Sequence, residues 1–253
     1  MNLKVMSFNL RTRVDADGIN CFDNRIDRIL ETIRTESPDL IGFQEATDAM
    51  REIIANLISD EYVMLGSGRN ADYTGESVPI AYKRSAASLL SFETFWLSAT
   101  PAVPGSCFQQ VEQSRCPRVA VVARLIPKGY GKPITFCNTH LDHMSDTARL
   151  LGMSQILQKL SLCGEGVILT GDMNARPDSL PITAARAFDG GRLSEASEPI
   201  EVTFHGWGTR AIKIDYIFSD FPSSNAYHVK DEPAEGTPYI SDHYPICATL
   251  DIG

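Results

Sequence analysis

Acidic, amide and imidazole side chains recur at the ends of short apolar segments from one terminus of the chain to the other. They are Asn9, Glu45, His140, Asp172, Asn174, Asp215, Asp242 and His243. The apolar segments have the character of strands. A side chain at a strand end is held on rigid scaffold at the rim of a sheet, where a preorganised site can form. Because the set offers hard oxygen ligands and no sulfur, it suits an ion such as magnesium.

The segment VILTGDMN places Asp172 and Asn174 two residues apart at the end of a predicted strand. Alternate side chains of a strand share one face, so both should point the same way and Met173 should point into the opposite layer. A carboxylate and an amide together can align water and hold a phosphate oxygen, which suits hydrolysis by in-line attack. The alternative is an Asx turn that only ends the strand.

Asp242 and His243 are adjacent in ISDHYP. Neighbouring side chains of extended backbone point to opposite sides, so the two should serve different partners unless the chain turns there. A histidine that faces a phosphate works best as a cation, with a carboxylate on its other ring nitrogen. Asp215, inside the apolar segment KIDYIF, is the candidate for that carboxylate. The alternative for Asp215 is a surface aspartate on an edge strand.

Glu45 ends the segment LIGFQE and is the best single candidate for a metal ligand. Its negative charge could also interact favourably with the dipole of a following helix, and the two roles are compatible. His140 stands in NTHLDH together with Asp142 and His143. Zinc would need a fixed tetrahedral set of ligands, and no matching His or Cys spacing occurs elsewhere in the sequence.

Taken together, these motifs resemble the endonuclease/exonuclease/phosphatase superfamily, which includes pancreatic deoxyribonuclease, abasic-site endonucleases, sphingomyelinases and inositol polyphosphate phosphatases. The resemblance runs from SFNLR to SDHYPICATL, with the motifs in the family's order. The chain is similar to a group of small bacterial members through GRNADYTGESVPIAY, TFWLSATPAVPGS, NTHLDH and TFHGW.

The resemblance implies a catalytic role for four of these residues. Asp172 would activate the nucleophile, and Asn174 would contact the phosphate and the transition state. His243 would face the scissile phosphate. His140 would contact the phosphate or help to protonate the leaving oxygen.

The resemblance also implies a metal site and a substrate contact. The ion, Mg²⁺ with Mn²⁺ as a substitute, would lie mainly on Glu45, with Asn9 and Asp242 nearby and waters completing its shell. Arg69 and Arg118 lie in segments that match the bacterial group, and a guanidinium fork fits a phosphate. The alternative for each arginine is a solvated or loop-bracing side chain.

Strand and helix patterns alternate along the chain. The predicted strands are 3–9, 39–45, 62–66, 78–83, 90–97, 118–126, 133–140, 167–174, 201–206, 213–219, 225–230 and 244–251. The predicted helices begin at Asp23, Thr47 and Asp146 or Thr147, with a short one near 180–188. Two strand-rich halves, each with helices on one side, are best buried sheet on sheet. The sequence therefore predicts an α/β protein, a four-layer α/β sandwich of two mixed β-sheets with helices outside, as a single domain of residues 1–253.

The net charge of −9 bears on the substrate. Duplex DNA is bound mainly through neutralisation of its phosphates, so this charge disfavours a nuclease that tracks a duplex without excluding it. The leading hypothesis is a metal-dependent phosphoesterase that acts on a small phosphorylated metabolite such as a sugar, polyol or lipid head group. The alternatives are a magnesium-dependent nuclease on DNA or RNA and a catalytically silent binding protein on the same fold.

The remaining features concern the compartment. No segment approaches transmembrane length and no signal peptide precedes the first strand, which favours the cytoplasm, although a secreted mature form would look the same. Of six cysteines, Cys137 and Cys247 lie in apolar strand segments and should be buried. Cys107 and Cys116 flank a long loop, 98–116, and could pair, but reduced thiols are the favoured interpretation.

Overall fold

The structure is a computed structural model that describes residues 1–164 and 166–253. Its strands are β1 (Asn2–Asn9), β2 (Leu40–Gln44), β3 (Tyr62–Leu65), β4 (Ile80–Lys83), β5 (Ala87–Trp96), β6 (Val119–Pro127), β7 (Ile134–His140), β8 (Val167–Asp172), β9 (Ser194–Glu195), β10 (Asp215–Ser219), β11 (Ser223–His228) and β12 (Ile246–Asp251). Its α-helices are α1 (Phe22–Glu36), α2 (Asp48–Leu57), α3 (Asp146–Ser161) and α4 (Leu180–Arg186), and short 3₁₀ helices are η1 (Asp15–Asn20) and η2 (Phe188–Gly190).

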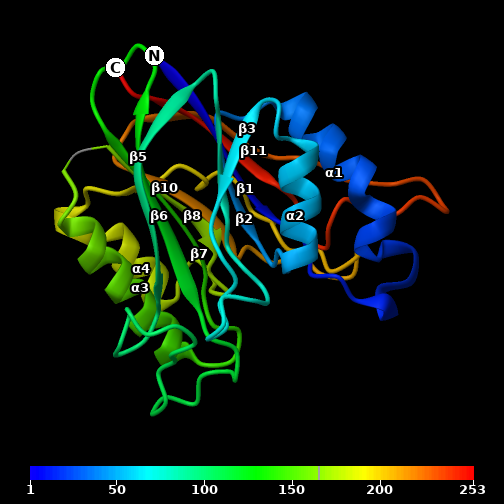
Figure 1. Ribbon diagram of the computed structural model, residues 1–253, viewed down its shortest axis with the longest axis horizontal. Helices are drawn as coiled ribbons and strands as arrows, with labels where there is room; N and C mark the ends of the chain where they lie inside the picture. The colour runs from blue at the N-terminus through cyan, green and yellow to red at the C-terminus, as the bar shows by residue number, and fades with distance from the viewer. Residues whose placement is uncertain (165) are drawn as a thin grey trace.

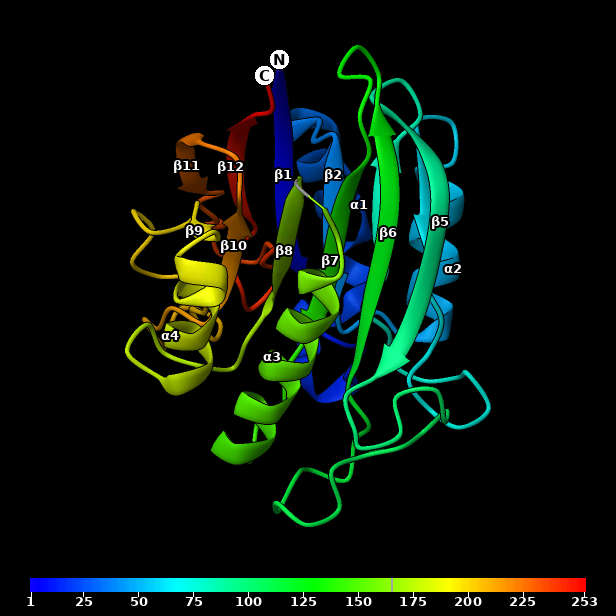
Figure 2. The same cartoon turned by 90° about the vertical axis from the view of Figure 1, so that its left-hand side faces the viewer.

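The strands form two six-stranded sheets that pack face to face, with orders β11-β12-β1-β2-β4-β3 and β5-β6-β7-β8-β10-β9. Buried aliphatic side chains from both sheets, such as Val5 and Val121, fill the space between them. Helices α1 and α2 cover the outer face of the first sheet through residues such as Ile29 and Ile54. Helices α3 and α4 cover the second sheet, as Figures 1 and 2 show. The predicted four-layer α/β sandwich is therefore confirmed.

Local sequence explains where α1 ends. Its buried face carries Ile29 and Ile33, spaced one turn apart. Ser37 then takes the left-handed conformation at φ 46° and donates its backbone N–H to the carbonyl of Ile33 at 2.8 Å. Pro38 follows and cannot extend the helix. The chain is thereby directed into β2, whose end carries Glu45.

The pairing of the central strands aligns several candidate residues. Strands β7 and β8 are parallel, with His140 opposite Asp172. Strand β10 is antiparallel to β8, with Asp215 opposite Asp172. In the first sheet, β1 and β2 are parallel, with Asn9 opposite Gln44. Strand pairing thus brings both sets of residues to one end of the sandwich.

Some strands join a different sheet from the one that their order in the sequence suggests. Strand β5 joins the second sheet, although it precedes the long loop, while β11 and β12 return to the first sheet. Because β12 pairs antiparallel with β1, the two chain termini lie side by side (Figure 1). The backbone N–H of Ile252 donates to the carbonyl of Met1 at 2.9 Å.

The prediction of a strand at 201–206 was wrong. Only Phe204 forms isolated bridges there, to Ile212 and His243. Gly206 and Trp207 follow with positive φ of 51° and 58°, so the chain turns where a strand would have to continue. The short strand β9 and the 3₁₀ helix η1 were not predicted either.

Candidate active site

The end of β1 connects the candidate residues of the two sheets. Asn9, which is 1% exposed, donates its amide to Glu45 Oε1 at 3.2 Å and to Asp172 Oδ2 at 3.0 Å. The side-chain oxygen of Asn9 accepts the backbone N–H of Arg11 at 2.9 Å. One buried amide therefore fixes two carboxylates that come from different sheets.

Glu45 lies just beyond the end of β2, in the left-handed region at φ 61°. This conformation is costly for a residue with a side chain, and such residues cluster at functional sites. The backbone N–H of Thr12 donates to Glu45 Oε2 at 2.8 Å. Both oxygens of the carboxylate are thus oriented by neighbours from the first sheet.

Asp172 and Asn174 lie close together, as expected, but a turn brings them together and not the alternation of side chains along a strand. Strand β8 ends at Asp172, and Asn174 takes the left-handed conformation at φ 47°. Its backbone N–H donates to Asp172 Oδ1 at 2.9 Å, so the pair forms an Asx-type turn that also orients the carboxylate. Met173 is fully buried in the core beneath α3 and α4, as predicted. The turn, and not the strand, therefore places Asn174.

His140 is held by the amide of Asn174. The Nδ2 group of Asn174 lies 2.9 Å from His140 Nε2 and also donates to the carbonyl of Leu141 at 3.0 Å. Burial, followed by the charges of Arg118 and Arg69, lowers the pKa of His140 well below its usual range. An imidazole whose Nε2 accepts a hydrogen bond is neutral and carries its proton on Nδ1. This arrangement does not favour His140 as a proton donor through Nε2.

His243 forms the carboxylate–imidazole pair that the sequence suggested. Its Nδ1 lies 2.8 Å from Asp215 Oδ2, and its Nε2 lies 3.8 Å from Asp172 Oδ2. Burial alone would lower the pKa of His243, but the charge and hydrogen bond of Asp215 raise it to about 10. The ring of Phe204 packs against the imidazole, with 4.8 Å between the ring centroids. His243 is therefore positioned as a buried cation beside Asp172.

Asp172 is 2% exposed and lies at the centre of the cluster. Burial, together with the charge of Asp215, raises the pKa of Asp172 to about 7, against the opposing effect of His243. A carboxylate that titrates near neutral pH is suited to accept and return a proton.

The donor set around Glu45 fits a divalent cation. Ligand atoms of Glu45, His140 and Asp172 lie within 4.8 Å of one another. Asp242, on the loop before β12, has its pKa raised by burial and by the charge of Glu45. Its Oδ2 lies 3.8 Å from Arg11 Nε, a guanidinium that is already engaged by Asp17 at 2.9 Å. The close carboxylates thus need positive charge, and hard oxygens suit magnesium or manganese.

The structure also places the two predicted arginines at this end of the sandwich. Arg69 and Arg118 line a small cavity of about 10 Å³ together with Glu45 and His140. Arg118 directly precedes β6, and Arg69 lies in the loop between β3 and β4. All ten candidate residues are thus found around the same strand ends.

Sequence reasoning missed several contributors. Arg11 contacts Asp242, Thr12 orients Glu45 through its backbone, and Phe204 packs on His243. The hydroxyl of Ser241 donates to the carbonyl of Asn9 at 2.7 Å and so connects the Asp242 loop to β1. The SFNLR and ISDHYP segments signalled these neighbourhoods, but backbone donors have no sequence signature.

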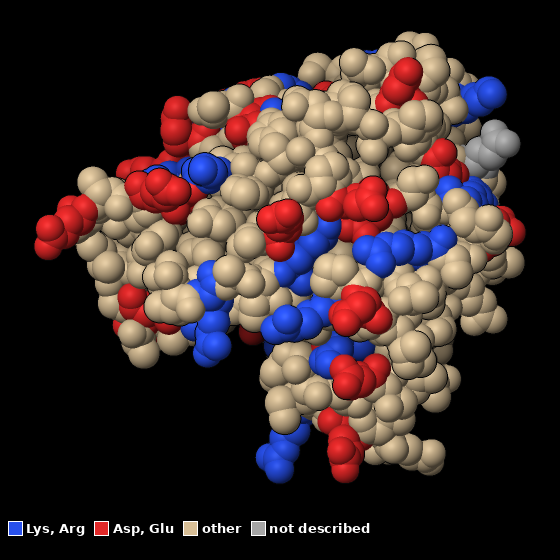
Figure 3. Space-filling view, turned by 180° about the vertical axis from the view of Figure 1, so that it is seen from behind, with Lys and Arg blue, Asp and Glu red and all other residues tan. Residues whose placement is uncertain are grey.

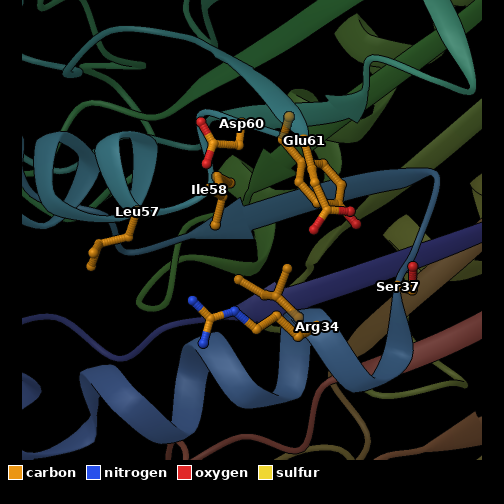
Figure 4. Close-up of a pocket in the computed structure, with 8 residues that line it drawn as sticks. Arg34, Ser37, Leu57, Ile58, Asp60 and Glu61 are labelled. Carbon is orange, nitrogen blue, oxygen red and sulfur yellow. The ribbon is translucent and has the colours of Figure 1, made fainter.

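A larger cavity of about 110 Å³ lies elsewhere, between the ends of α1 and α2. Figure 4 shows its lining, in which Arg34, Leu57, Asp60 and Glu61 are labelled. None of the candidate catalytic residues lines it. Its size therefore does not make it the catalytic centre.

The family model of the endonuclease/exonuclease/phosphatase family matches residues 6–243. The chain belongs to this family. Its members are phosphoester hydrolases and typically depend on a divalent metal.

Individual relatives of the family cover nearly the whole chain. The chain is 26% identical over 266 residues to an uncharacterised protein of Acanthamoeba polyphaga mimivirus, covering 96% of this chain and 98% of that protein. An endonuclease/exonuclease/phosphatase structure from Bacteroides vulgatus is 25% identical, with a TM-score of 0.90 and full coverage of both chains. A mannosyl-6-phosphatase from Bacteroides thetaiotaomicron is 24% identical, with a TM-score of 0.85 and coverage of 98% and 100%.

In the described parts of the chain, no helix combines the length and the apolar character that a membrane crossing would require. The six cysteines are all free thiols in the structure, so Cys107 and Cys116 are not paired. Cys137 and Cys247 are buried, as predicted.

Proposed function

We propose that this chain is a metal-dependent phosphoesterase that hydrolyses the phosphate ester of a small metabolite, and that residues 1–253 act as a single domain. One observation carries the proposal. Asp172, a carboxylate with a pKa of about 7, lies at buried strand ends between the cationic imidazole of His243 and the amide of Asn9. The similarity in fold to a mannosyl-6-phosphatase supports a small phosphorylated substrate.

Glu45 is the principal metal ligand in this proposal, because it belongs both to the ligand set expected from the sequence and to the oxygen cluster of the structure. Asp242 and Asn9 stand beside it as further candidates. When bound, a Mg²⁺ or Mn²⁺ ion would polarise the phosphoryl oxygens as a Lewis acid. Asn9 and the backbone N–H of Thr12 orient the two oxygens of the Glu45 carboxylate.

The protein groups supply the remaining steps. Asp172 accepts a proton from the attacking water, whose oxygen forms the new bond to phosphorus while the ester bond to phosphorus breaks. The leaving oxygen keeps the electron pair of the broken bond and takes up a proton from solvent to give the alcohol. Asn174 holds Asp172 through its backbone N–H. His243, kept protonated by Asp215, stabilises the charge on the phosphoryl oxygens. Arg69 and Arg118, which line one cavity with Glu45 and His140, bind the phosphate.

A substrate screen tests the proposal. Phosphomonoesters, small phosphodiesters and oligonucleotides are offered in buffer with Mg²⁺ or Mn²⁺ and in buffer with excess chelator. We expect hydrolysis of a small ester that chelation abolishes and added metal restores, with Ca²⁺ restoring less because its looser geometry positions water poorly. Full turnover in excess chelator would contradict the metal assignment.

Variants connect the activity to this site. D172N should lower kcat by ~10²–10⁴-fold, the usual worth of a positioned acid–base group. D178N is the matched control, because Asp178 lies in the loop that follows Asp172 but is exposed. Equal activity of D172N and D178N, with unchanged circular dichroism, would show that the site is misplaced.

A further inference from the structure

Arg118 is a buried cation whose own surroundings leave it incompletely paired. The residue is 4% exposed, and among the described residues its Nε and Nη1 atoms are buried without a hydrogen-bond partner. Only Nη2 has a close partner, His143 Nδ1 at 2.7 Å. A nitrogen that accepts from a guanidinium belongs to a neutral imidazole, so His143 brings no counter-charge.

The nearest carboxylate does not complete the pairing. Asp142 Oδ2 lies 3.7 Å from Arg118 Nε, beyond normal hydrogen-bond length. Its oxygens already accept the backbone N–H groups of Ser145 at 2.8 Å and Met144 at 3.0 Å. They also accept the N–H and hydroxyl of Ser114, which fastens the long loop to this end of the sheet. Asp142 therefore serves mainly the loop, and the guanidinium retains unused donors.

A second guanidinium lies on the same cavity. Arg69 is held by its hairpin, because its backbone N–H donates to the carbonyl of Glu76 at 2.9 Å and its carbonyl accepts Trp96 Nε1 at 2.6 Å. Its Nη2 pairs with Glu76 Oε2 at 2.9 Å. Burial, followed by the charge of Arg69, lowers the pKa of Arg118. Two guanidinium groups thus line one cavity. Glu76 pairs with Arg69, whereas Arg118 keeps unused donors that suit an anion.

The shape of this space limits what can enter. The cavity of about 10 Å³ is lined by Glu45, Glu76, His140 and the two arginines. That volume is about what a single water oxygen needs, so it suits an oxygen atom that carries no carbon substituent. In an in-line attack three oxygens of the phosphoryl group lie in the equatorial plane. All three are unsubstituted and charged in a monoester, whereas one carries carbon in a diester.

We propose that Arg118, supported by Arg69, binds an unsubstituted oxygen of the substrate phosphate and makes the enzyme selective for phosphomonoesters over phosphodiesters. The inference rests on the proposed function and names its substrate class. In the proposed function His243 contacts one phosphoryl oxygen and the ion on Glu45 contacts a second. Arg118, whose cavity Glu45 also lines, supplies the contact for the third oxygen. Only a monoester presents an unsubstituted, charged oxygen to each of His243, the ion on Glu45 and Arg118.

The test compares 4-nitrophenyl phosphate with methyl 4-nitrophenyl phosphate in the same Mg²⁺ or Mn²⁺ buffer. Wild type should prefer the monoester. R118Q should lose ~10–100-fold in kcat/KM on the monoester, the worth of charge-assisted hydrogen bonds, and less than ~5-fold on the diester. R124Q is the matched control, because Arg124 lies on β6, the strand that follows Arg118, but is exposed. A wild-type preference for the diester, or equal losses of R118Q on both substrates, would overturn the inference.

Additional variants guard against a folding defect. R69Q removes the less buried guanidinium and should give a smaller loss that is again confined to the monoester. R118K, which keeps the charge without the fork, should fall between wild type and R118Q. If R118Q shows a lowered thermal midpoint, the test rests on R69Q and R118K. Losses of kcat/KM in these two variants that are equal for both substrates would count against the inference.

A binding measurement separates this inference from the proposed function. Inorganic phosphate should inhibit wild type competitively and R118Q at least ~10-fold more weakly, whereas dimethyl phosphate should not distinguish them. Hydrolysis of neither substrate by wild type would contradict the proposed function itself. Calorimetry with inorganic phosphate would then test the cavity without any reaction. Equal phosphate affinities of wild type and R118Q would exclude an anion site there.

Discussion

At the scale of single residues, the least replaceable pair in the cluster is Asp215 with His243. The carboxylate holds the imidazole at 2.8 Å, and both groups are almost fully buried. Removing the charge of a buried partner leaves the other group uncompensated, which costs more than the pair itself contributes. The pair therefore has to be tested by a change that keeps its shape.

We predict that D215N lowers kcat by at least ~10²-fold while KM changes little, because the amide keeps the hydrogen-bond geometry but cannot stabilise a cationic imidazole. The steady-state rate on a phosphate ester measures this effect. D189N is a suitable control because Asp189 is exposed and far along the chain from the strand ends. Wild-type turnover in D215N would remove His243 from the proposed catalytic role.

The cysteines give a second prediction at this scale. Cys137 and Cys247 are buried in strands, and burial raises the pKa of Cys247 to about 12 and that of Cys137 further. The reactive thiolate is therefore scarce in both at any ordinary pH. Ellman's reagent should titrate four thiols in the folded protein at pH 8 and six in denaturant. Six fast thiols in the folded protein would contradict the burial of these strands.

At the scale of the elements, a buried polar network joins the two sheets behind the site. Asn138 on β7 donates to the carbonyls of Phe43 at 2.7 Å and Pro79 at 3.2 Å, and accepts from Gln44 at 2.8 Å. The hydroxyl of Thr170 on β8 donates to the same Asn138 oxygen at 3.0 Å. Gln44 Oε1 is the one atom of these side chains that is buried without a hydrogen-bond partner among the described residues. A buried polar network of this kind sets the register between packed layers. The network therefore helps to set the position of Glu45, at the end of the first sheet's β2, relative to Asp172, at the end of the second sheet's β8.

Gly42 is the position that makes this contact possible. A Cβ there would lie 2.2 Å from Thr170 Oγ1 and 2.5 Å from Asn138 Oδ1. We predict that G42A lowers the free energy of unfolding by at least about 2 kcal/mol through overpacking and loss of buried hydrogen bonds. Urea denaturation measures it.

G164A is the control for that measurement. An added Cβ at Gly164 meets nothing within 4 Å, and the glycine does not need a positive φ. Its effect should stay within about 0.5 kcal/mol, as for most surface substitutions. Equal stabilities of G42A and G164A would mean that the sheets can separate without penalty at Gly42.

The strand ends were predictable because their pattern is local. Asn9, Glu45, His140 and Asp172 each close an apolar segment, and this alone indicates the rim of a sheet. The pairing of those strands is not local, and the sequence did not show that β5 and β12 change sheets. The placement of Asn174 was misjudged because a left-handed turn, which alternation cannot reveal, carries it back toward Asp172.

The same limit applies to groups whose role depends on distant partners. Arg118 was found through a motif, but its unused donors follow from the way the long loop engages Asp142. The strand predicted at 201–206 failed because Gly206 and Trp207 turn the chain, although the apolar pattern before them favours a strand. The sequence therefore predicts which residues gather, and the tertiary structure decides which atoms meet.

At the scale of the whole molecule, charge separates the proposed substrate class from nucleic acid. The net charge is −9, and Figure 3 shows acidic and basic side chains interspersed over one face of the molecule. The arginine cavity can offset the charge of one phosphate locally. It cannot offset the repeated charge of a duplex, which is bound through many phosphate contacts at once.

We therefore predict that a soluble phosphomonoester is hydrolysed with a far higher kcat/KM than plasmid or abasic-site DNA in the same Mg²⁺ buffer at physiological salt. Salt dependence makes the comparison sharper. A nuclease that binds DNA through counterion release loses rate steeply as salt rises. Here the long-range field is repulsive, so the rate on DNA should stay flat or rise as salt screens it. A steep loss of DNA hydrolysis with salt, or a higher kcat/KM on DNA, would make nuclease activity the better account of this fold.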